Sequence, residues 1–313
     1  MSELNFPIGY TYDFFVPGDY VNTLNGSAYK LFSGFGRRVY CPQTDTSKVT
    51  DMSYMFYNNT SMVGLSKFDT SSCTDMSYMF SGCSNLLTVP LFDTSKVTDM
   101  RDMFNGCSYL YEVPLFDTSK VTNMYYMFQK CTRLMSIPQF DTSKVTTFYY
   151  TFCECTNLVD VPLLDTSSAE SMSNMFQSCT RLMSIPQFDT SNVVSVYYMF
   201  SGCSSLRSVP LLDFGKVNSM GYIFGSSTMN YLTDLGGFKD LGKSSSVSGS
   251  TSYFLSNCSN LTHESLMNVI NNLYDRKTAG YSTLSLKFGS TNLAKLTDEE
   301  KAIATNKGFT LTT

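Results

Sequence analysis

The chain has 313 residues, of which 42% are hydrophobic and 15% charged, and its formal net charge is −4. This composition supplies enough apolar material for a continuous core and too little charge for a disordered tail. The net negative charge and the lack of a Lys/Arg cluster in the sequence exclude the basic surface that binds nucleic acid. No apolar run approaches the ~20 residues that span a bilayer. We therefore expect no nucleic-acid partner and no membrane insertion.

Residues 1–44 are predicted to form an N-terminal cap or docking segment that includes one degenerate coil. Residues 1–28 are rich in Tyr, Phe, Gly and Asp, and the register of the later repeats is already visible at Phe35 and Cys41. The start of the chain has neither the basic n-region nor the apolar h-region of a secretory signal. An extracellular chain would then use another export route, or its signal has been removed.

Residues 45–262 are predicted to form a solenoid, because they repeat with a period of 24 through eight units without an insertion. The repeat is marked by aspartates at Asp45, Asp69, Asp93, Asp117, Asp141, Asp165, Asp189 and Asp213. Phenylalanines keep the same register from Phe56 to Phe224, and cysteines keep it from Cys83 to Cys203. The stretch CTRLMSIPQFDTS occurs identically at 131–143 and 179–191, which indicates duplication of a two-repeat block.

A single repeat cannot fold alone. In the coil from Leu86 to Cys107 we expect seven buried apolar side chains, Leu91 among them, which contribute roughly 10–20 kcal/mol. Ordering the backbone costs about 1–2 kcal/mol for each residue, so only stacked coils are stable. The Leu-x-x-Val-Pro-Leu-Phe segment is the expected strand, and Val-Thr-Asp-Met-Ser-Tyr-Met-Phe suits a helical or 3₁₀ turn or a tight irregular stretch.

The repeat resembles the BspA-type leucine-rich repeats of bacterial and mycoplasma surface proteins and of phages of such hosts. The similarity lies in the run Cys-x-x-Leu-x-x-Val-Pro-Leu-Phe-Asp-Thr-Ser-Lys-Val-Thr-x-Met-x-x-Met-Phe and covers about residues 45–262. The predicted fold class is a leucine-rich-repeat-like solenoid of short parallel strands in about nine 24-residue coils, with an α/β C-terminal cap. The resemblance implies a solenoid used for attachment.

Residues 263–313 are predicted to form that α/β cap, which covers the last open edge of the solenoid. Thr262 is expected to cap a helix near 263–274, and Thr297 with Glu300 has the spacing of a capping box for a helix that ends near 307. A strand is expected at 282–288. Residues 236–252 are predicted to form a Gly/Ser-rich insertion loop, after which Phe254 begins one last partial coil.

No pattern in the chain indicates catalytic chemistry, so the protein is predicted not to be an enzyme. His263 is the single histidine, and no set of other catalytic residue types accompanies it in the sequence. The motifs of phosphate loops, hydrolases and zinc peptidases are missing from the sequence. The ladder cysteines are expected to be reduced and buried. The alternative is that disulfides join cysteines of neighbouring coils. The aspartates suit turns, with a calcium ladder as the alternative. We predict no catalytic residue, no metal and no cofactor.

Tyrosines supply the candidate partner-binding site. They occupy two adjacent positions of the repeat, between core methionines, at Tyr54, Tyr78, Tyr125, Tyr126, Tyr149, Tyr150, Tyr197, Tyr198 and Tyr222. Binding surfaces favour tyrosine because it provides broad contact at low entropic cost. The polar substitutes Asp102 and Asn174 favour a solvent-facing position. The alternative, left open, is that the rings stack along the solenoid and cover the core.

The predicted function is a non-enzymatic binding or attachment scaffold. We expect first a phage virion fibre or decoration protein, located in the virion, that contacts the host surface or other virion proteins. The alternative is a BspA-like adhesin at a bacterial cell surface or outside the cell. The expected partner is a protein or glycan on a cell surface, or another virion protein, and a homo-oligomer is possible. A glycan-acting enzyme is disfavoured, since no paired carboxylate stands outside the repeat register.

Overall fold

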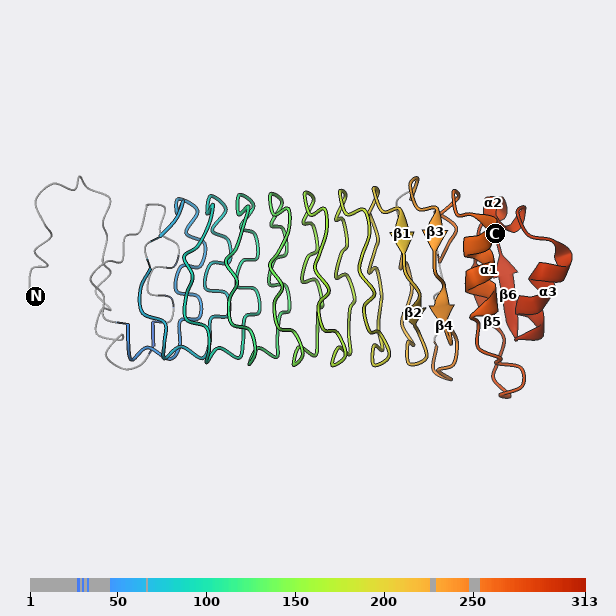
Figure 1. Ribbon diagram of the computed structural model, residues 1–313, viewed down its shortest axis with the longest axis horizontal. Helices are drawn as coiled ribbons and strands as arrows, with labels where there is room; N and C mark the ends of the chain where they lie inside the picture. Colours follow the sequence, from blue (N-terminus) through green and yellow to red (C-terminus); the bar gives the residue numbers. More distant parts are fainter. Residues whose placement is uncertain are drawn as a thin grey trace, which may run out of the picture.

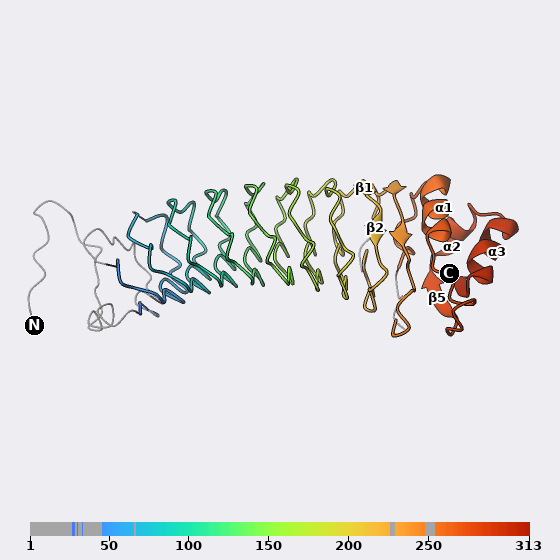
Figure 2. The same cartoon turned by 60° about the horizontal axis from the view of Figure 1, so that its bottom comes forward.

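The computed structural model describes residues 27, 28, 30, 33, 46–65, 67–225, 229–247 and 254–313. Within them the chain forms an elongated stack of flat coils that ends in a group of helices (Figure 1). A view turned by 60° shows the coils in the same order along the long axis (Figure 2). Most of the predicted N-terminal segment 1–44 lies outside the described residues, and the division of the chain into domains stays a prediction.

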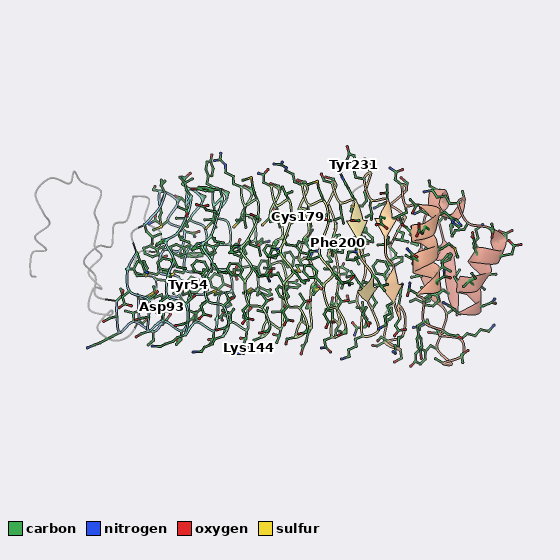
Figure 3. The ribbon with its side chains drawn as sticks, in the orientation of Figure 1. Tyr54, Asp93, Lys144, Cys179, Phe200 and Tyr231 are labelled. Atoms are coloured by element: carbon green, nitrogen blue, oxygen red, sulfur yellow. The ribbon has the colours of Figure 1, made fainter. Side chains whose placement is uncertain are left out.

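Each coil has two long sides that meet across a shared core. One side follows the Asp-Thr-Ser turn and contains the Met-x-x-Met-Phe run, and the other follows the cysteine and leads back to the next aspartate. Figure 3 shows Lys144 at the lower edge of the stack and Tyr231 at its upper edge. Phe104 from the first side and Phe116 from the second lie with ring centroids 6.3 Å apart. We call these the tyrosine side and the leucine side.

Among the described residues, the leucine side has regular strands only near the end of the stack. There β1 (Ser208–Val209) pairs in parallel with β3 (Asp234–Leu235), and β2 (Leu212–Asp213) pairs with β4 (Phe238–Lys239). Pro210 separates β1 from β2 because proline has no N–H to donate. In the earlier coils the same segment is extended but is joined to its neighbour by isolated hydrogen bonds, such as that from Leu87 N to Val63 O (2.9 Å).

The tyrosine side is built from consecutive turns and contains neither a helical nor a 3₁₀ turn within the described coils. Of the three predicted conformations, it adopts the tight irregular stretch. Within one coil, Met55 N donates to Met52 O and Tyr57 N to Tyr54 O. The alternate amides donate to the next coil, as Tyr54 N does to Ser77 O at 2.9 Å. Tyr54 has a φ of +57°, so every second amide points along the stack while the others close turns.

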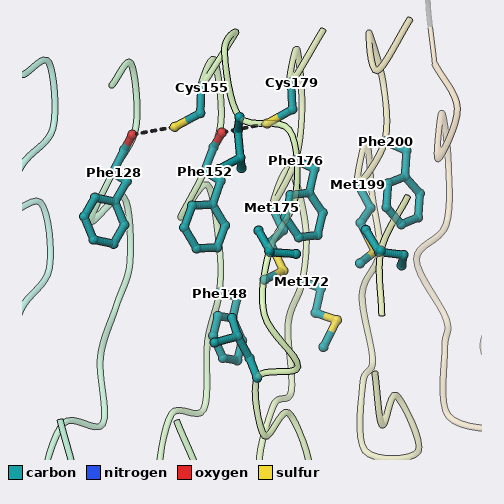
Figure 4. Close-up of a cluster of buried hydrophobic side chains, with 14 of the residues drawn as sticks. Phe128, Phe148, Phe152, Cys155, Met172, Met175, Phe176, Cys179, Met199 and Phe200 are labelled. Carbon is teal, nitrogen blue, oxygen red and sulfur yellow. Dashed lines mark hydrogen bonds between the residues drawn. The ribbon is translucent and has the colours of Figure 1, made fainter. Parts of the chain in front are cut away.

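The core is a set of apolar ladders, one residue of each kind from every coil. Met100, Met103, Phe104 and Cys107 are each fully buried. Figure 4 shows the phenylalanine ladder, whose neighbours Phe128 and Phe152 stack with centroids 5.7 Å apart. Such parallel, buried rings give each coil a partner on both sides, which is why coils that are unstable alone are stable in a stack.

The six ladder cysteines are free thiols that donate hydrogen bonds to the coil before. The sulfur of Cys155 lies 3.0 Å from Phe128 O, and that of Cys179 lies 3.0 Å from Phe152 O (Figure 4). Burial raises the pKa of both thiols above the usual 9.0. Each protonated S–H group thus donates a hydrogen bond to an otherwise buried carbonyl oxygen, and the cysteines link neighbouring coils in this form.

Leu91 does not belong to the core, and its predicted burial is wrong. Its side chain is 52% exposed, whereas the next residue, Phe92, is 2% exposed and faces the core. Successive side chains of an extended segment point to opposite sides, so only one of two adjacent apolar residues can be inside.

The C-terminal part contains α1 (His263–Asn271), β5 (Leu284–Lys287), α2 (Ser290–Leu293), α3 (Asp298–Asn306) and β6 (Phe309–Thr312). β5 and β6 pair in parallel. Thr262 caps α1 through Ser265 N, and the capping box of Thr297 with Glu300 is formed, so both helix starts are confirmed. The first helix ends three residues before the predicted 274. Among the described residues, no helix is long and apolar enough to cross a membrane.

The predicted insertion loop 236–252 is wrong over its first part. Phe238 lies in β4, and Phe238 and Leu241 are both fully buried. Residues 236–241 therefore form part of a coil that contains two extra residues, since Leu212 pairs with Phe238 instead of following the 24-residue spacing. The Gly/Ser content led to the wrong prediction here, because Gly237 lies between β3 and β4 with a φ of +99°, which glycine adopts readily.

Candidate functional site

Six tyrosines, one for each of six coils, form a column on the tyrosine side. We define this tyrosine column as Tyr54, Tyr78, Tyr126, Tyr150, Tyr198 and Tyr222. All six are half-buried and have φ values between +55° and +57°. They stack in pairs: the ring centroids lie 4.4 Å apart in Tyr54–Tyr78, 4.7 Å in Tyr126–Tyr150 and 4.8 Å in Tyr198–Tyr222.

A second row of tyrosines lies directly beside the column. Tyr125 meets Tyr126 edge to face with centroids 4.3 Å apart, and Tyr149 meets Tyr150 in the same way at 4.5 Å. Tyr197 meets Tyr198 at 4.5 Å and is 37% exposed. The four rings at 125, 126, 149 and 150 thus form one aromatic cluster. The structure gathers the predicted tyrosines into three groups, which Asp102 and Asn174 separate, and within each group rings stack along the solenoid.

The interpretation of Asp102 and Asn174 as solvent-facing substitutes is wrong. Their side chains are 4% and 3% exposed, and their φ values are +55° and +58°. Asp102 accepts a hydrogen bond from Asn105 at 2.7 Å, and Asn174 donates one to Gln177 at 2.6 Å. Asn and Asp are the non-glycine residues that best tolerate this left-handed backbone. Backbone geometry, not exposure to water, therefore explains which residues interrupt the column.

Two neighbouring members of the tyrosine column have a raised pKa. Burial, followed by the neighbouring Tyr149, raises the pKa of Tyr150 to about 12. Burial and the side chain of Tyr125 also raise the pKa of Tyr126. These two hydroxyls are therefore neutral and can donate hydrogen bonds to carbonyl, carboxylate or sugar oxygens.

Neighbouring coils are joined by more backbone hydrogen bonds on the tyrosine side than on the leucine side. In one coil, four amides between Met100 and Gly106 donate to the next coil on the tyrosine side. On the leucine side, the amides of Tyr109 and Tyr111 form two bonds with the coil before. The stacked rings of the tyrosine column, which are 4.4–4.8 Å apart, lie on the more densely bonded side.

The leucine side presents apolar side chains that the sequence analysis placed inside or overlooked. We define the leucine row as Leu91, Leu115, Leu163 and Leu211, which are 52%, 59%, 58% and 38% exposed. Met135, from a neighbouring position of the repeat, is 54% exposed. The sequence held part of the signal: each row member directly precedes another apolar residue, and adjacent residues of an extended segment face opposite ways, so one residue of each pair had to be exposed.

The aspartate ladder forms turns, as predicted. In each described unit from Asp69 to Asp213 the carboxylate accepts a hydrogen bond from the amide two residues later, for example Ser95 N to Asp93 Oδ1 at 3.1 Å. The Ser95 hydroxyl and amide hold the pKa of Asp93 below 3.8. Asp45 lies outside the described residues. Within the described part, no three His, Cys, Asp or Glu side chains group as metal ligands.

The lone histidine lies between two helices of the C-terminal part. His263 Nε2 is 2.8 Å from Glu300 Oε1, and the two residues belong to α1 and α3. Glu300 also completes the capping box of α3. This contact fits a structural link between helices.

The fold and its repeat define the class of the protein: a solenoid of leucine-rich-type coils. The family model described as "Mycoplasma protein of unknown function, DUF285" matches residues 30–135, 87–183, 135–238 and 159–261. These overlapping matches cover more than half of the chain. The chain therefore belongs to this family, and its repeats are of the BspA leucine-rich type.

Three solved structures illustrate the similarity. A leucine-rich repeat protein of T. pallidum is 22% identical (TM-score 0.27), over 52% of this chain and 65% of its own. One from Bacteroides ovatus is 15% identical (0.21), over 66% and 75%. A leucine-rich cell surface protein from Faecalibacterium prausnitzii is 17% identical (0.25), over 60% and 76%. The chain thus spans less than two thirds of the first of these. No curated protein matches the chain.

Proposed function

We propose that this protein is a non-enzymatic binding scaffold of the adhesin kind that acts at a bacterial cell surface. The observation that supports it best is the leucine row. Four large apolar side chains stand exposed in register on a molecule whose core is already filled by Phe, Met, Leu, Val and Cys from every coil. Contiguous exposed apolar side chains are typical of interaction surfaces, and Leu91 and Leu115 lie in adjacent coils. The proposed partner is a protein or glycan on another cell.

The virion role receives no support from either the structure or the comparisons. The alternative stated with it, a BspA-like surface adhesin, is consistent with the family to which the chain belongs. We therefore propose the adhesin role in place of the phage fibre or decoration protein.

The tyrosines remain the second part of this proposal. Tyr54, Tyr78, Tyr125, Tyr126, Tyr149, Tyr150, Tyr197, Tyr198 and Tyr222 are proposed as partner-binding residues. Their rings are pre-packed against one another, so a partner loses little side-chain entropy when it binds them. Because they also stack, they contribute to stability, and an experiment must separate the two roles.

The test measures attachment of protein-coated beads to epithelial cell layers and binding to an array of glycans. The variant Leu115→Ser with Leu163→Ser removes exposed apolar contacts, and Lys144→Ser is its control. The triple variant Tyr126→Asn, Tyr150→Asn, Tyr198→Asn keeps the left-handed backbone, since Asn174 already occupies this position. Interface aromatics typically contribute about 1–2 kcal/mol or more each, so binding should fall sharply, whereas the melting temperature should fall only through the loss of ring stacking, about 0.5–1.5 kcal/mol for each pair.

The opposite results have clear meanings. Retained binding with a much lower melting temperature would show that the tyrosines are structural cover. If neither surface contributes to attachment and the chain self-associates through the leucine row in sedimentation experiments, the adhesin role is wrong.

A further inference from the structure

A pocket opens on the leucine side near the C-terminal end of the stack. It encloses about 280 Å³ and is lined by Val159, Arg181, Met183, Ser205, Arg207 and Tyr231. The Tyr231 side chain is 60% exposed and stands at the upper edge of the molecule (Figure 3). Met183 is 39% exposed. The pocket thus combines two cationic groups with apolar and aromatic walls, and we call it the arginine pocket.

The two arginines in this pocket differ from the other arginines that the structure describes. Arg101 pairs with Asp99 at 3.3 Å, and Arg133 lies over the Tyr109 ring with its guanidinium 3.9 Å from the centroid. Arg276 is 1% exposed and donates to backbone carbonyls.

Neither Arg181 nor Arg207 forms an ion pair within the described residues. Arg181 Nη1 donates to the neutral Asn157 Oδ1 at 3.2 Å, which orients the guanidinium without neutralising its charge. The main chain of the other residue is held in place, since Arg207 N donates to Met183 O at 2.9 Å. Two exposed guanidinium groups that lack an ion pair and line one pocket favour an anionic ligand.

We propose that the arginine pocket binds a carboxylate side chain, with an apolar side chain beside it, on an acidic segment of a partner protein. This inference rests on the proposed binding function and specifies its partner. A guanidinium presents a planar fork of N–H donors that matches a carboxylate, and charge-assisted hydrogen bonds are stronger than neutral ones. Tyr231 and Met183 supply the surface for the apolar neighbour.

The surroundings of the pocket favour a protein over an acidic sugar. Leu163 lies four residues after Val159, and Leu211 lies four residues after Arg207, so two exposed leucines lie on the same face as the pocket, with Gln187 at the equivalent position of the coil between them. Aliphatic and thioether side chains lose water favourably against apolar side chains and gain little from a polyhydroxylated ring.

The duplicated segment provides an internal control. Arg133 and Arg181 occupy the same place in two identical stretches of sequence, but Arg133 already covers the Tyr109 ring and is not part of this pocket. The variants Arg181→Gln and Arg207→Gln remove a charge from the pocket, whereas Arg133→Gln removes the matched charge elsewhere on the same face.

The experiment measures binding of a blocked peptide, acetyl-Phe-Glu-Phe-Glu-amide, to the full chain by isothermal calorimetry and NMR. Its neutral counterpart is acetyl-Phe-Gln-Phe-Gln-amide. We expect the acidic peptide to bind more tightly, and each of Arg181→Gln and Arg207→Gln to weaken it about tenfold, the loss of one charge-assisted bond. Arg133→Gln should leave binding unchanged, and added salt should weaken it.

Three outcomes would overturn the pocket proposal. These are equal affinity for both peptides, including no binding of either at millimolar concentration; the same loss from Arg133→Gln as from Arg181→Gln; and tighter binding of a sialylated trisaccharide than of the acidic peptide. The bead assay tests the adhesin role separately from the arginine pocket. If the double variant Arg181→Gln with Arg207→Gln still attaches to cells, the adhesin role stands without this pocket.

Discussion

Two stretches of this molecule, 131–143 and 179–191, have the same thirteen residues in the same order. Their buried parts behave alike. Ile137 and Ile185 are both 7% exposed, and Leu134 and Leu182 are both fully buried. The inside of a coil therefore depends on the repeat alone.

The outer side chains of the two stretches behave differently. Arg133 lies over Tyr109, whereas the equivalent Arg181 donates to Asn157 and opens into a pocket. The methionine two residues later is 54% exposed in the first copy and 39% in the second. The residue 24 positions away decides the difference, since stacking places it directly beside the arginine. A repeat fixes the core, and its neighbours set the surface chemistry.

The largest expected effect concerns the register that both copies share. Deleting 117–140, one whole repeat that contains most of the first copy, should leave a folded chain, because the remaining ladders realign. Deleting only twelve residues, 117–128, should unfold much of the stack, since it places exposed positions opposite core positions. Circular dichroism and thermal melting measure both, and equal stability of the two deletions would refute the stacked-coil account.

A smaller effect concerns alkaline pH. Burial raises the pKa of Cys131 and of Cys179 well above 9.0. Below pH 9 these thiols are protonated in the folded and unfolded chains alike, so they add no pH dependence. Above pH 9 the unfolded chain loses protons that the folded chain retains, and the free energy of unfolding falls by about 1.4 kcal/mol per thiol and pH unit.

Urea unfolding between pH 8 and 10.5 measures this dependence. Cys131→Ala and Cys179→Ala should each reduce the slope by the same amount, because both thiols donate to a phenylalanine carbonyl at the same place in the coil. Unequal slopes would show that the two copies differ inside as well as outside.

The smallest effect separates the two arginines. Arg133→Gln should destabilise the chain by about 0.5–1 kcal/mol through loss of the contact with the Tyr109 ring. The Arg181 guanidinium makes no such ring contact, so Arg181→Gln should change the free energy of unfolding by no more than about 0.5 kcal/mol. Melting temperatures of both variants, with Tyr109→Ser as a third, provide the measurement. A Tyr109→Ser background should abolish the difference between the two arginine variants.

The order of the 24 residues was sufficient to predict the stack, because a repeat without insertions can bury its apolar residues only against copies of itself. The cap of α3 was equally local, since Thr297 and Glu300 contact each other within one helical turn. The turn role of the aspartates also followed from sequence, because Asp93 needs only the amide of Ser95.

What sequence could not decide was the side to which each residue of the coil points. Leu91 and Phe92 are both apolar, and only the packing of Phe92 against Phe80 and Phe116 shows which one is inside. Asp102 was predicted to face solvent because it is polar, but it is 4% exposed and accepts a hydrogen bond from Asn105 in the same coil.

The arginine pocket depends on tertiary structure most of all. Its walls come from Val159, Arg181, Ser205 and Tyr231, which belong to four successive coils. Stacking brings them together because it places residues one repeat apart in direct contact. The sequence thus determined that coils stack, whereas the chemistry of the surface arose only where the stack set unlike residues side by side.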